Sequence, residues 1–326
     1  MNFQVKIVCL SFIISVIISI IIVPILRKLK VGQIERSDGP QSHIKKQGTP
    51  TMGGIILIIT LCIVIAMTYF YYVKKEQMDI AKQLIPMLIM SVMFGIVGLV
   101  DDFKKLVLKN TTGLKPSLKM LGLLIISVVY VMYLVNISHI GTDTYIPILK
   151  QYINIPIFAY IPFAIIVILA TTNAVNLTDG IDGLASSVCI IIITCLAVIG
   201  IINNVKEVVI LASAVIGALL GFLIFNLHPA KVFMGDTGSL FLGGFISVLA
   251  LYMKMPLLLL IIAFIPVVEA LSVILQVIYF KKTGKRIFKM APLHHHFELS
   301  GWSENKVVML FSIITLILCV IGIQII

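Results

Sequence analysis

Long apolar runs, separated by short polar segments, recur along the whole chain. Most runs approach the roughly 20 apolar residues that a helix needs to cross a bilayer, and all are too long for ordinary strands. We therefore predict ten membrane-spanning helices, at residues 5–26, 52–73, 84–100, 118–137, 156–172, 184–202, 207–225, 239–254, 256–280 and 306–326. The polar stretch 138–155 is predicted to hold a short hairpin or a surface helix.

The composition agrees with a polytopic membrane protein. Of the 326 residues, 60% are hydrophobic and 12% are charged, and the mean hydropathy of +1.14 lies outside the soluble range. Ten spans would use about 200 residues, so one integral membrane domain is predicted over residues 1–326. The first run lacks a small-residue cleavage site and precedes its basic cluster, which favours a permanent span over a signal peptide.

The basic residues predict which helix ends face the cytoplasm. Alternating loops carry 18 of the 25 Lys and Arg residues, and these loops are 27–51, 101–119, 173–183, 226–239 and 281–306. The positive-inside rule makes them cytoplasmic and places both termini outside. Nine of the fourteen acidic residues lie on the same side. A functional site is therefore expected on the cytoplasmic loops.

Two acidic motifs lie in these loops. Asp101 and Asp102, in "GLVDDFKK", end an apolar helix at the membrane surface. In "NAVNLTDGIDGLA", Asn176, Asp179 and Asp182 are spaced by three, so on a helix they would line one face. Their oxygens suit a hard cation such as Mg²⁺ that holds phosphates, and the glycines would let a ligand approach the backbone. A solvated helix end and a polar hinge remain the alternatives.

A third acidic motif is "KVFMGDTGS", where Asp236 opens the eighth span. A carboxylate and backbone N–H groups meet there at a helix amino end, an arrangement that suits a metal-bound phosphate. The alternative is that Asp236 simply caps its helix. Three such motifs on one face of a membrane protein favour a shared site.

Basic and polar groups complete this predicted site. Lys45 and Lys46, in "HIKKQGTPTMGG", can hold phosphate oxygens, or can serve topology alone. The three consecutive histidines of "PLHHHFELSGW" lack ligand spacing for zinc, but histidine can donate to a phosphate or transfer a proton. A polar stripe of Glu269, Ser272 and Gln276 in the ninth span must face protein or water. Whether this stripe packs helices or has a function stays open. All five cysteines are expected to be packing residues.

Together these motifs resemble those of the phospho-N-acetylmuramoyl-pentapeptide transferases (MraY), within the polyprenyl-phosphate N-acetylhexosamine-1-phosphate transferase superfamily. The likeness covers about residues 36–306. "GTPTMGG" and "PLHHHFELSGW" are typical of this branch rather than of the sibling that uses UDP-N-acetylglucosamine, whereas "TGLKPSLKM" departs from many relatives. The resemblance implies an all-α enzyme of the bacterial inner (cytoplasmic) membrane with Mg²⁺ as cofactor, often a homodimer, and no nucleic-acid partner.

The implied reaction joins UDP-N-acetylmuramoyl-pentapeptide to undecaprenyl phosphate and yields UMP and lipid I. The resemblance implies Asp236 as the principal Mg²⁺ ligand, and its catalytic residues would be Asp101, Asp102, Asp236, His295 and His296. It implies a nucleotide and sugar site formed by Lys46, Thr51, Asn176, Asp179, Gly180, Asp182, Asn226, Phe233 and Gln276. Of these, Gly180, Asn226 and Phe233 would shape the uridine pocket.

We expect undecaprenyl phosphate to attack the β-phosphate directly, with Asp101 as the base. The alternative mechanism is a covalent aspartyl-phosphate intermediate on Asp101 or Asp102. Two alternative functions are the sibling transferase and, from another class, a membrane transporter. Ten spans and intramembrane polar residues such as Glu269 also fit a transporter, but a transporter predicts charged residues near mid-membrane and polar groups on both sides, whereas the acids here cluster at one surface.

Overall fold

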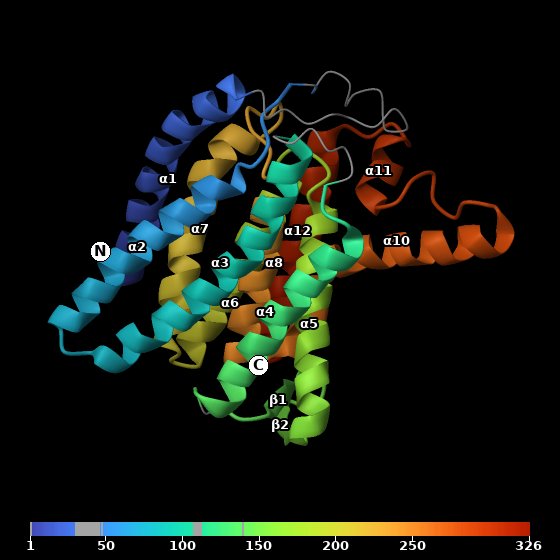
Figure 1. The fold of residues 1–326 in the computed structure, drawn as a ribbon. Coiled ribbons are helices and arrows are strands. Elements are labelled where there is room, and N and C mark those ends of the chain that lie inside the picture. Colours follow the sequence, from blue (N-terminus) through green and yellow to red (C-terminus); the bar gives the residue numbers. More distant parts are fainter. Residues whose placement is uncertain (1, 30–45, 47, 107–112, 139) are drawn as a thin grey trace.

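The computed structural model describes residues 2–29, 46, 48–106, 113–138 and 140–326. Ten of its helices are long and apolar enough to cross a membrane, as predicted (Figure 1). These are α1 (Phe3–Lys28), α2 (Gly54–Lys74), α3 (Met78–Leu106), α4 (Pro116–Asn136), α5 (Ile157–Thr178), α6 (Leu184–Ile202), α7 (Lys206–Asn226), α8 (Gly235–Tyr252), α10 (Phe264–Thr283) and α12 (Glu304–Gln324).

The remaining elements are short. The stretch 138–155 contains the hairpin, with β1 (Asp143–Ile146) paired antiparallel to β2 (Gln151–Asn154). A 3₁₀ turn η2 (Pro256–Leu258), a single helical turn α9 (Leu259–Ile262) and the histidine-bearing α11 (Leu293–Glu298) complete the chain. Of the two alternatives for residues 138–155, the hairpin is therefore confirmed.

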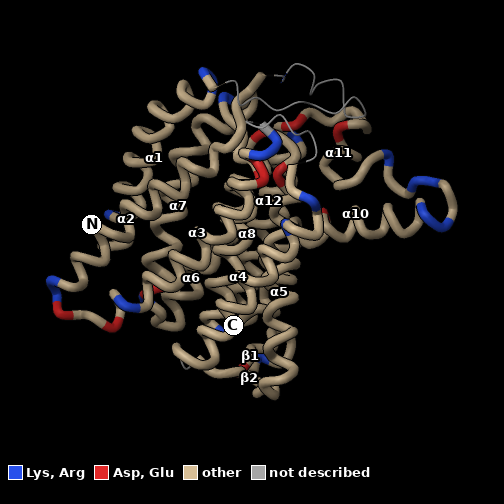
Figure 2. Tube along the Cα trace, viewed as in Figure 1, with Lys and Arg blue, Asp and Glu red and all other residues tan. Residues whose placement is uncertain are grey.

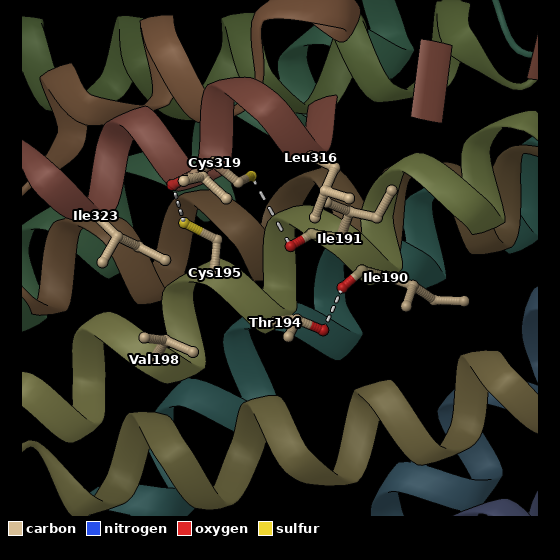
Figure 3. Close-up of a pocket in the computed structure, with 9 residues that line it drawn as sticks. Ile190, Ile191, Thr194, Cys195, Val198, Leu316, Cys319 and Ile323 are labelled. Carbon is tan, nitrogen blue, oxygen red and sulfur yellow. Dashed lines mark hydrogen bonds between the residues drawn. The ribbon is translucent and has the colours of Figure 1, made fainter. Parts of the chain in front are cut away.

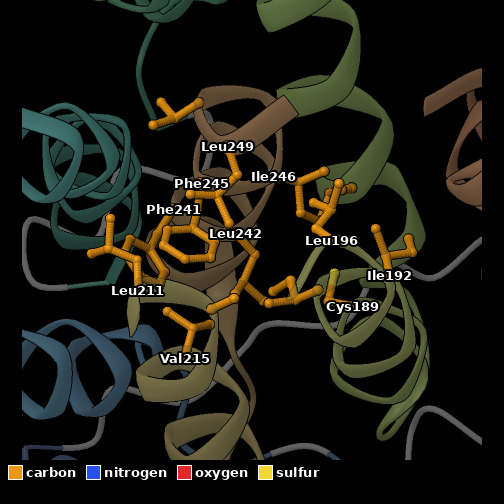
Figure 4. Packing of buried hydrophobic residues seen from close by; sticks show 14 of the residues in the cluster. Cys189, Ile192, Leu196, Leu211, Val215, Phe241, Leu242, Phe245, Ile246 and Leu249 are labelled. Atoms are coloured by element: carbon orange, nitrogen blue, oxygen red, sulfur yellow. The ribbon is translucent and has the colours of Figure 1, made fainter. Parts of the chain in front are cut away.

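Helix α8 forms the centre of the bundle. In its spanning segment 83% of the residues are buried, against 22% in α10. Figure 4 shows apolar side chains from α6, α7 and α8 packed together, with Phe241, Phe245 and Leu249 of α8 among them. Small residues bring the neighbouring helices close, because a Cβ on Gly98 would collide with the backbone of Asp236. The amino end of α8, where Asp236 lies, is thus held by α3.

The ninth predicted span is wrong as one continuous helix. Residues 256–262 form η2 and α9, and the long helix α10 begins only at Phe264. Pro266 has no N–H to donate to the carbonyl of Ile262, and that carbonyl lies 3.7 Å from Cys319 Sγ instead. Figure 1 shows that α10 runs outward, across the direction of α5 and α12. Its exposed Leu271, Ile274 and Leu275 suit a hydrocarbon environment.

The five loops predicted to be cytoplasmic meet at one end of the bundle. Lys46 contacts Asp182 and Glu304, and Lys105 contacts Asp236, so segments from all five loops are in contact or adjacent there. Figure 2 shows acidic and basic residues gathered at this end, and basic residues at the tip of α10. The sidedness of the loops and termini in the membrane stays a prediction.

A small apolar cavity of about 170 Å³ lies between α6 and α12 (Figure 3). Cys195 and Cys319 line it, and Cys195 Sγ lies 3.6 Å from the carbonyl oxygen of Cys319. All five cysteines are free thiols, and Cys189, Cys195 and Cys319 are buried. These three cysteines pack in the interior, as predicted, and the cavity that Cys195 and Cys319 border is apolar and separate from the acidic motifs.

Candidate functional site

Asp236 lies in the first turn of α8 and is paired with two lysines and an amide. Its Oδ2 is 2.7 Å from Lys105 Nζ and 3.0 Å from Lys119 Nζ. Its Oδ1 accepts a hydrogen bond of 2.7 Å from Asn176 Nδ2. The helix dipole favours a negative group at this position. The Asp236 carboxylate is thus fixed by three contacts and remains partly accessible, at the end of the bundle where the five loops meet.

Asp101 shares both lysines with Asp236. Its Oδ2 lies 2.9 Å from Lys105 Nζ and 3.3 Å from Lys119 Nζ, and its Oδ1 accepts from the backbone N–H of Leu114 at 2.7 Å. Two ammonium groups between two carboxylates form a compact charged cluster. The sequence reasoning did not place these lysines in the site. Lys105 could have been found from its position four residues after Asp101, but Lys119 lies in the stretch that departs from relatives.

Asp102 points away from the lysines and caps α8. Its carboxylate accepts hydrogen bonds from Thr237 Oγ1 at 2.6 Å, from the Thr237 N–H at 2.9 Å and from the Asp236 N–H at 3.2 Å. The helix has no side-chain cap of its own, so the alternative that Asp236 caps its own helix is wrong. Gly235, at φ +72°, lies against Asp102 and the buried Thr51. Asp102 therefore fixes where Asp236 sits.

The segment 173–183 divides between two clusters. Helix α5 ends at Thr178, so Asn176 faces Asp236 whereas Asp182 belongs to a turn and faces elsewhere. The prediction that Asn176, Asp179 and Asp182 line one helix face is wrong, because Gly183 at φ +75° belongs to a turn that interrupts the helix. Asp179 follows directly after α5. Burial, together with the nearby carboxylates of Asp236 and Asp102, raises the pKa of Asp179 to about 8.

A second cluster surrounds Asp182. Its Oδ1 lies 2.7 Å from Lys46 Nζ, and its Oδ2 lies 2.9 Å from His228 Nδ1 and accepts from the Ala230 N–H. Glu304 Oε2 is 2.6 Å from the same Lys46 ammonium. Burial acts to lower the pKa of Lys46, but hydrogen bonds from its ammonium to the two acids raise it overall. Sequence reasoning did not identify His228 or Glu304 as members of this cluster.

Asp182, His228 and Glu304 also form a group with metal-ligand geometry. Their ligand atoms lie within 4.8 Å of one another. Lys46 already supplies a positive charge to two of the three, at ion-pair distance. A divalent cation at this group would have to compete with that ammonium. Asp236 Oδ2 is likewise in contact with two ammonium groups, so a cation at the first cluster would face the same competition.

The three histidines of α11 point to three different partners. His294 is fully buried against Glu269, with Nδ1 3.1 Å from Glu269 Oε2. His295 Nδ1 lies 2.8 Å from Glu298, and His296 Nδ1 accepts from the backbone N–H of Lys289. The motif thus offers one buried ring and two partly exposed rings. The buried His294 was not among the predicted site residues.

The polar stripe of α10 faces protein, as predicted. Glu269 and Ser272 are buried, and Gln276 accepts hydrogen bonds from the N–H groups of Ile287 and Phe288. Gln276 also donates to the carbonyl of Phe288 at 3.1 Å. The Gln276 amide therefore fixes the loop that leads to α11.

Three predicted uridine-pocket residues have contacts within the protein. Asn226 is buried, accepts from Ser186 Oγ at 2.7 Å and donates to the Val232 carbonyl. Phe233 is half-buried, and its backbone hydrogen bonds to Pro50 and Gly53 join the "KVFMGDTGS" motif to the "HIKKQGTPTMGG" motif. Gly180 lies against the His294 ring, so the space beside its Cα is filled by protein. The expectation that this glycine leaves open space for a ligand is wrong on that side. Lys45, a candidate phosphate ligand, lies outside the described residues.

The chain is similar to known proteins over most of its length. The profile of Glycosyl transferase family 4 matches residues 84–254, and a phospho-N-acetylmuramoyl-pentapeptide-transferase signature matches residues 46–58. The chain is 50% identical over 313 residues to a phospho-N-acetylmuramoyl-pentapeptide-transferase of Clostridium botulinum, which covers 96% of this chain and 93% of the relative. A protein of the same name from Caldicellulosiruptor bescii is 46% identical over 319 residues, covering 98% and 96%. The similarity extends over nearly the full length of both chains.

Proposed function

Because the chain belongs to the phospho-N-acetylmuramoyl-pentapeptide transferase family, we propose that the clusters around Asp236 and Asp182 carry out that family's reaction. The enzyme transfers phospho-N-acetylmuramoyl-pentapeptide from its UDP-linked donor to undecaprenyl phosphate, giving lipid I and UMP. The observation that supports this site best is the pair of lysines shared by Asp101 and Asp236. Both reactants are anions, and these ammonium groups reduce the repulsion between them.

Mg²⁺ is the proposed cofactor, with Asp236 as its principal ligand. Carboxylate oxygens are the donors that this hard cation prefers. The raised pKa of Asp179 supports the fit in part, because burial, its largest cause, is accompanied by negative charge from Asp236 and Asp102 that a cation would offset. When bound, the ion would stabilise charge on the pyrophosphate of the donor.

The proposed reaction is a direct displacement. A phosphate oxygen of undecaprenyl phosphate forms a bond to the β-phosphorus, and the bond between that phosphorus and the bridging oxygen breaks as UMP leaves. Asp101 would accept the proton of an acceptor phosphate that arrives protonated. Lys105 and Lys119, already within 3.3 Å of Asp101 and within 3.0 Å of Asp236, can turn to the phosphate oxygens.

The geometry favours direct attack over a covalent intermediate on Asp102. That carboxylate accepts three hydrogen bonds from the start of α8 and so has a positioning role. Of Asp101 and Asp102, only Asp101 is then placed to be the nucleophile of the covalent mechanism. Exchange of labelled UMP into the nucleotide substrate in the absence of any lipid acceptor would refute the direct mechanism.

The remaining predicted residues have proposed roles in substrate binding. Lys46 and Asp182 would hold the nucleotide end, since they meet beside the motif that carries Phe233. His295 and His296, on the partly exposed side of α11, would contact the phosphate or the sugar. The other proposed contacts are Thr51, Asn176, Asp179, Gly180, Asn226 and Gln276. A homodimer and a cytoplasm-facing site in the inner membrane complete the proposal.

The test is UMP release by purified protein in detergent. Undecaprenyl phosphate is supplied with either UDP-N-acetylmuramoyl-pentapeptide or UDP-N-acetylglucosamine, with Mg²⁺ or with EDTA. We expect Mg²⁺-dependent release from the muramoyl substrate alone. Asp236→Asn should abolish release, whereas Asp143→Asn, an exposed acid of β1 that pairs with Lys254, is the matched control and should retain it. Release that persists in EDTA, or in Asp236→Asn, would contradict the assignment.

A further inference from the structure

A buried acid and a buried histidine meet beneath the loop that carries Asp179 and Asp182. Glu269 of α10 and His294 of α11 are each about 1% exposed at the side chain. Glu269 Oε1 accepts from the backbone N–H of His294, and its Oε2 lies 3.1 Å from His294 Nδ1. A buried acid within a membrane protein is costly unless it is paired, and such pairs mark functional sites. The proposed reaction does not use this pair.

The pairing determines which nitrogen of His294 carries the proton. Glu269 Oε1 accepts from a backbone N–H, and where its second oxygen accepts as well, Nδ1 is the donor. In a neutral imidazole the other nitrogen, Nε2, then has a bare lone pair and acts as an acceptor. Glu269 contacts both the backbone N–H and the Nδ1 of His294. Turning the ring to exchange its two nitrogens would therefore break the Nδ1 contact.

The Nε2 atom is buried and has no hydrogen-bond partner among the described residues. It points at Gly180, the residue between Asp179 and Ile181 in the aspartate loop, and a Cβ on that glycine would collide with it. A buried acceptor without a donor is unfavourable. Gly180 itself is half-buried.

We propose that Glu269 is a positioning residue and that His294 Nε2 accepts a hydrogen bond from the UDP-linked substrate. The donor would be a hydroxyl or an amide N–H, and it would reach Nε2 when the loop at Gly180 shifts on binding. This inference rests on the proposed function. It gives the stripe residue Glu269 a function that helix packing alone would not require.

Glu269→Gln is the variant that tests the pair. A glutamine amide keeps the shape but can turn its NH₂ toward Nδ1, which moves the imidazole proton to Nε2 and converts the acceptor into a donor. We expect kcat/KM for UDP-N-acetylmuramoyl-pentapeptide to fall by about 10- to 100-fold, with the KM for undecaprenyl phosphate unchanged. Ser272→Ala, buried one turn further along the same helix, is the matched control and should behave as the wild type.

Nitrogen-15 NMR of histidine-labelled protein gives a readout that does not depend on turnover. The chain has six histidines, and the wild-type His294 should show a protonated Nδ1 and a bare Nε2. Addition of the UDP-linked substrate should shift the Nε2 signal, and undecaprenyl phosphate alone should not. An Nε2–H tautomer or an imidazolium in the wild type would overturn the proposal, as would equal kinetics for Glu269→Gln and Ser272→Ala.

The NMR experiment remains decisive if Glu269→Gln does not fold, because the wild type alone reports the tautomer. It also separates the two hypotheses. A wild-type protein that binds the nucleotide substrate at Nε2 but releases no UMP would refute the proposed function and not this inference. A wild-type protein that turns over without any shift at Nε2 would refute this inference and not the function.

Discussion

Gly180→Ala adds one methyl group where the structure has no room for it. The new Cβ would lie 2.6 Å from Cε1 and 3.1 Å from Cδ2 of the His294 ring, and closer still to Nε2. The ring cannot retreat, because Glu269 holds its backbone N–H and its Nδ1. The loop that carries Asp179 and Asp182 must therefore move by about 1 Å, since contacts this short are repulsive.

Overpacking of this kind costs about 1–3 kcal/mol. If the whole of this cost is added to the activation free energy, kcat/KM for the UDP-linked substrate falls by about 5- to 150-fold, at 1.36 kcal/mol per factor of ten. The assay is steady-state UMP release together with thermal denaturation in detergent. The control is Gly122→Ala in α4, where the nearest side-chain atom, on Val97, is 3.3 Å from the new Cβ. Unchanged kcat/KM and unchanged thermal midpoint for Gly180→Ala would refute the contact with His294.

Three further predictions follow from the charged clusters. Asp102→Asn should destabilise the fold by about 1–3 kcal/mol, because an amide nitrogen would face N–H donors at the start of α8. The measurement is the free energy of unfolding by denaturant, with Asp143→Asn as the control. Lys46→Met should cost about 3–5 kcal/mol, because it leaves two buried carboxylates without their cation; a loss no larger than that of the exposed Lys206→Met would contradict this. The pKa of Asp179 is raised from 3.8 to about 8, so its protonated form stabilises the metal-free fold at low pH and that stability is lost as pH rises to about 8. Added Mg²⁺ should therefore raise the thermal midpoint more at pH 8 than at pH 6, and an equal rise at both would argue against a metal beside Asp179.

The sequence by itself determined the helical content and the family. Apolar runs of bilayer length are local features, so they predicted ten spanning helices, and the motif order predicted the family. The asymmetry of Lys and Arg grouped five loops that the structure brings to one end. These inferences succeed because the bilayer imposes the same length and charge rules on each segment separately.

Only the tertiary structure decided which side chains meet. Asp101 and Asp102 are neighbours in sequence, yet one pairs with lysines and the other caps a helix 135 residues away. Glu269 meets its partner His294 25 residues further along the chain. The split of the ninth span depends on Pro266 and on Cys319 of α12. Such contacts join segments far apart in the chain, and no local period or composition encodes them, because they are chosen by the packing of the whole bundle.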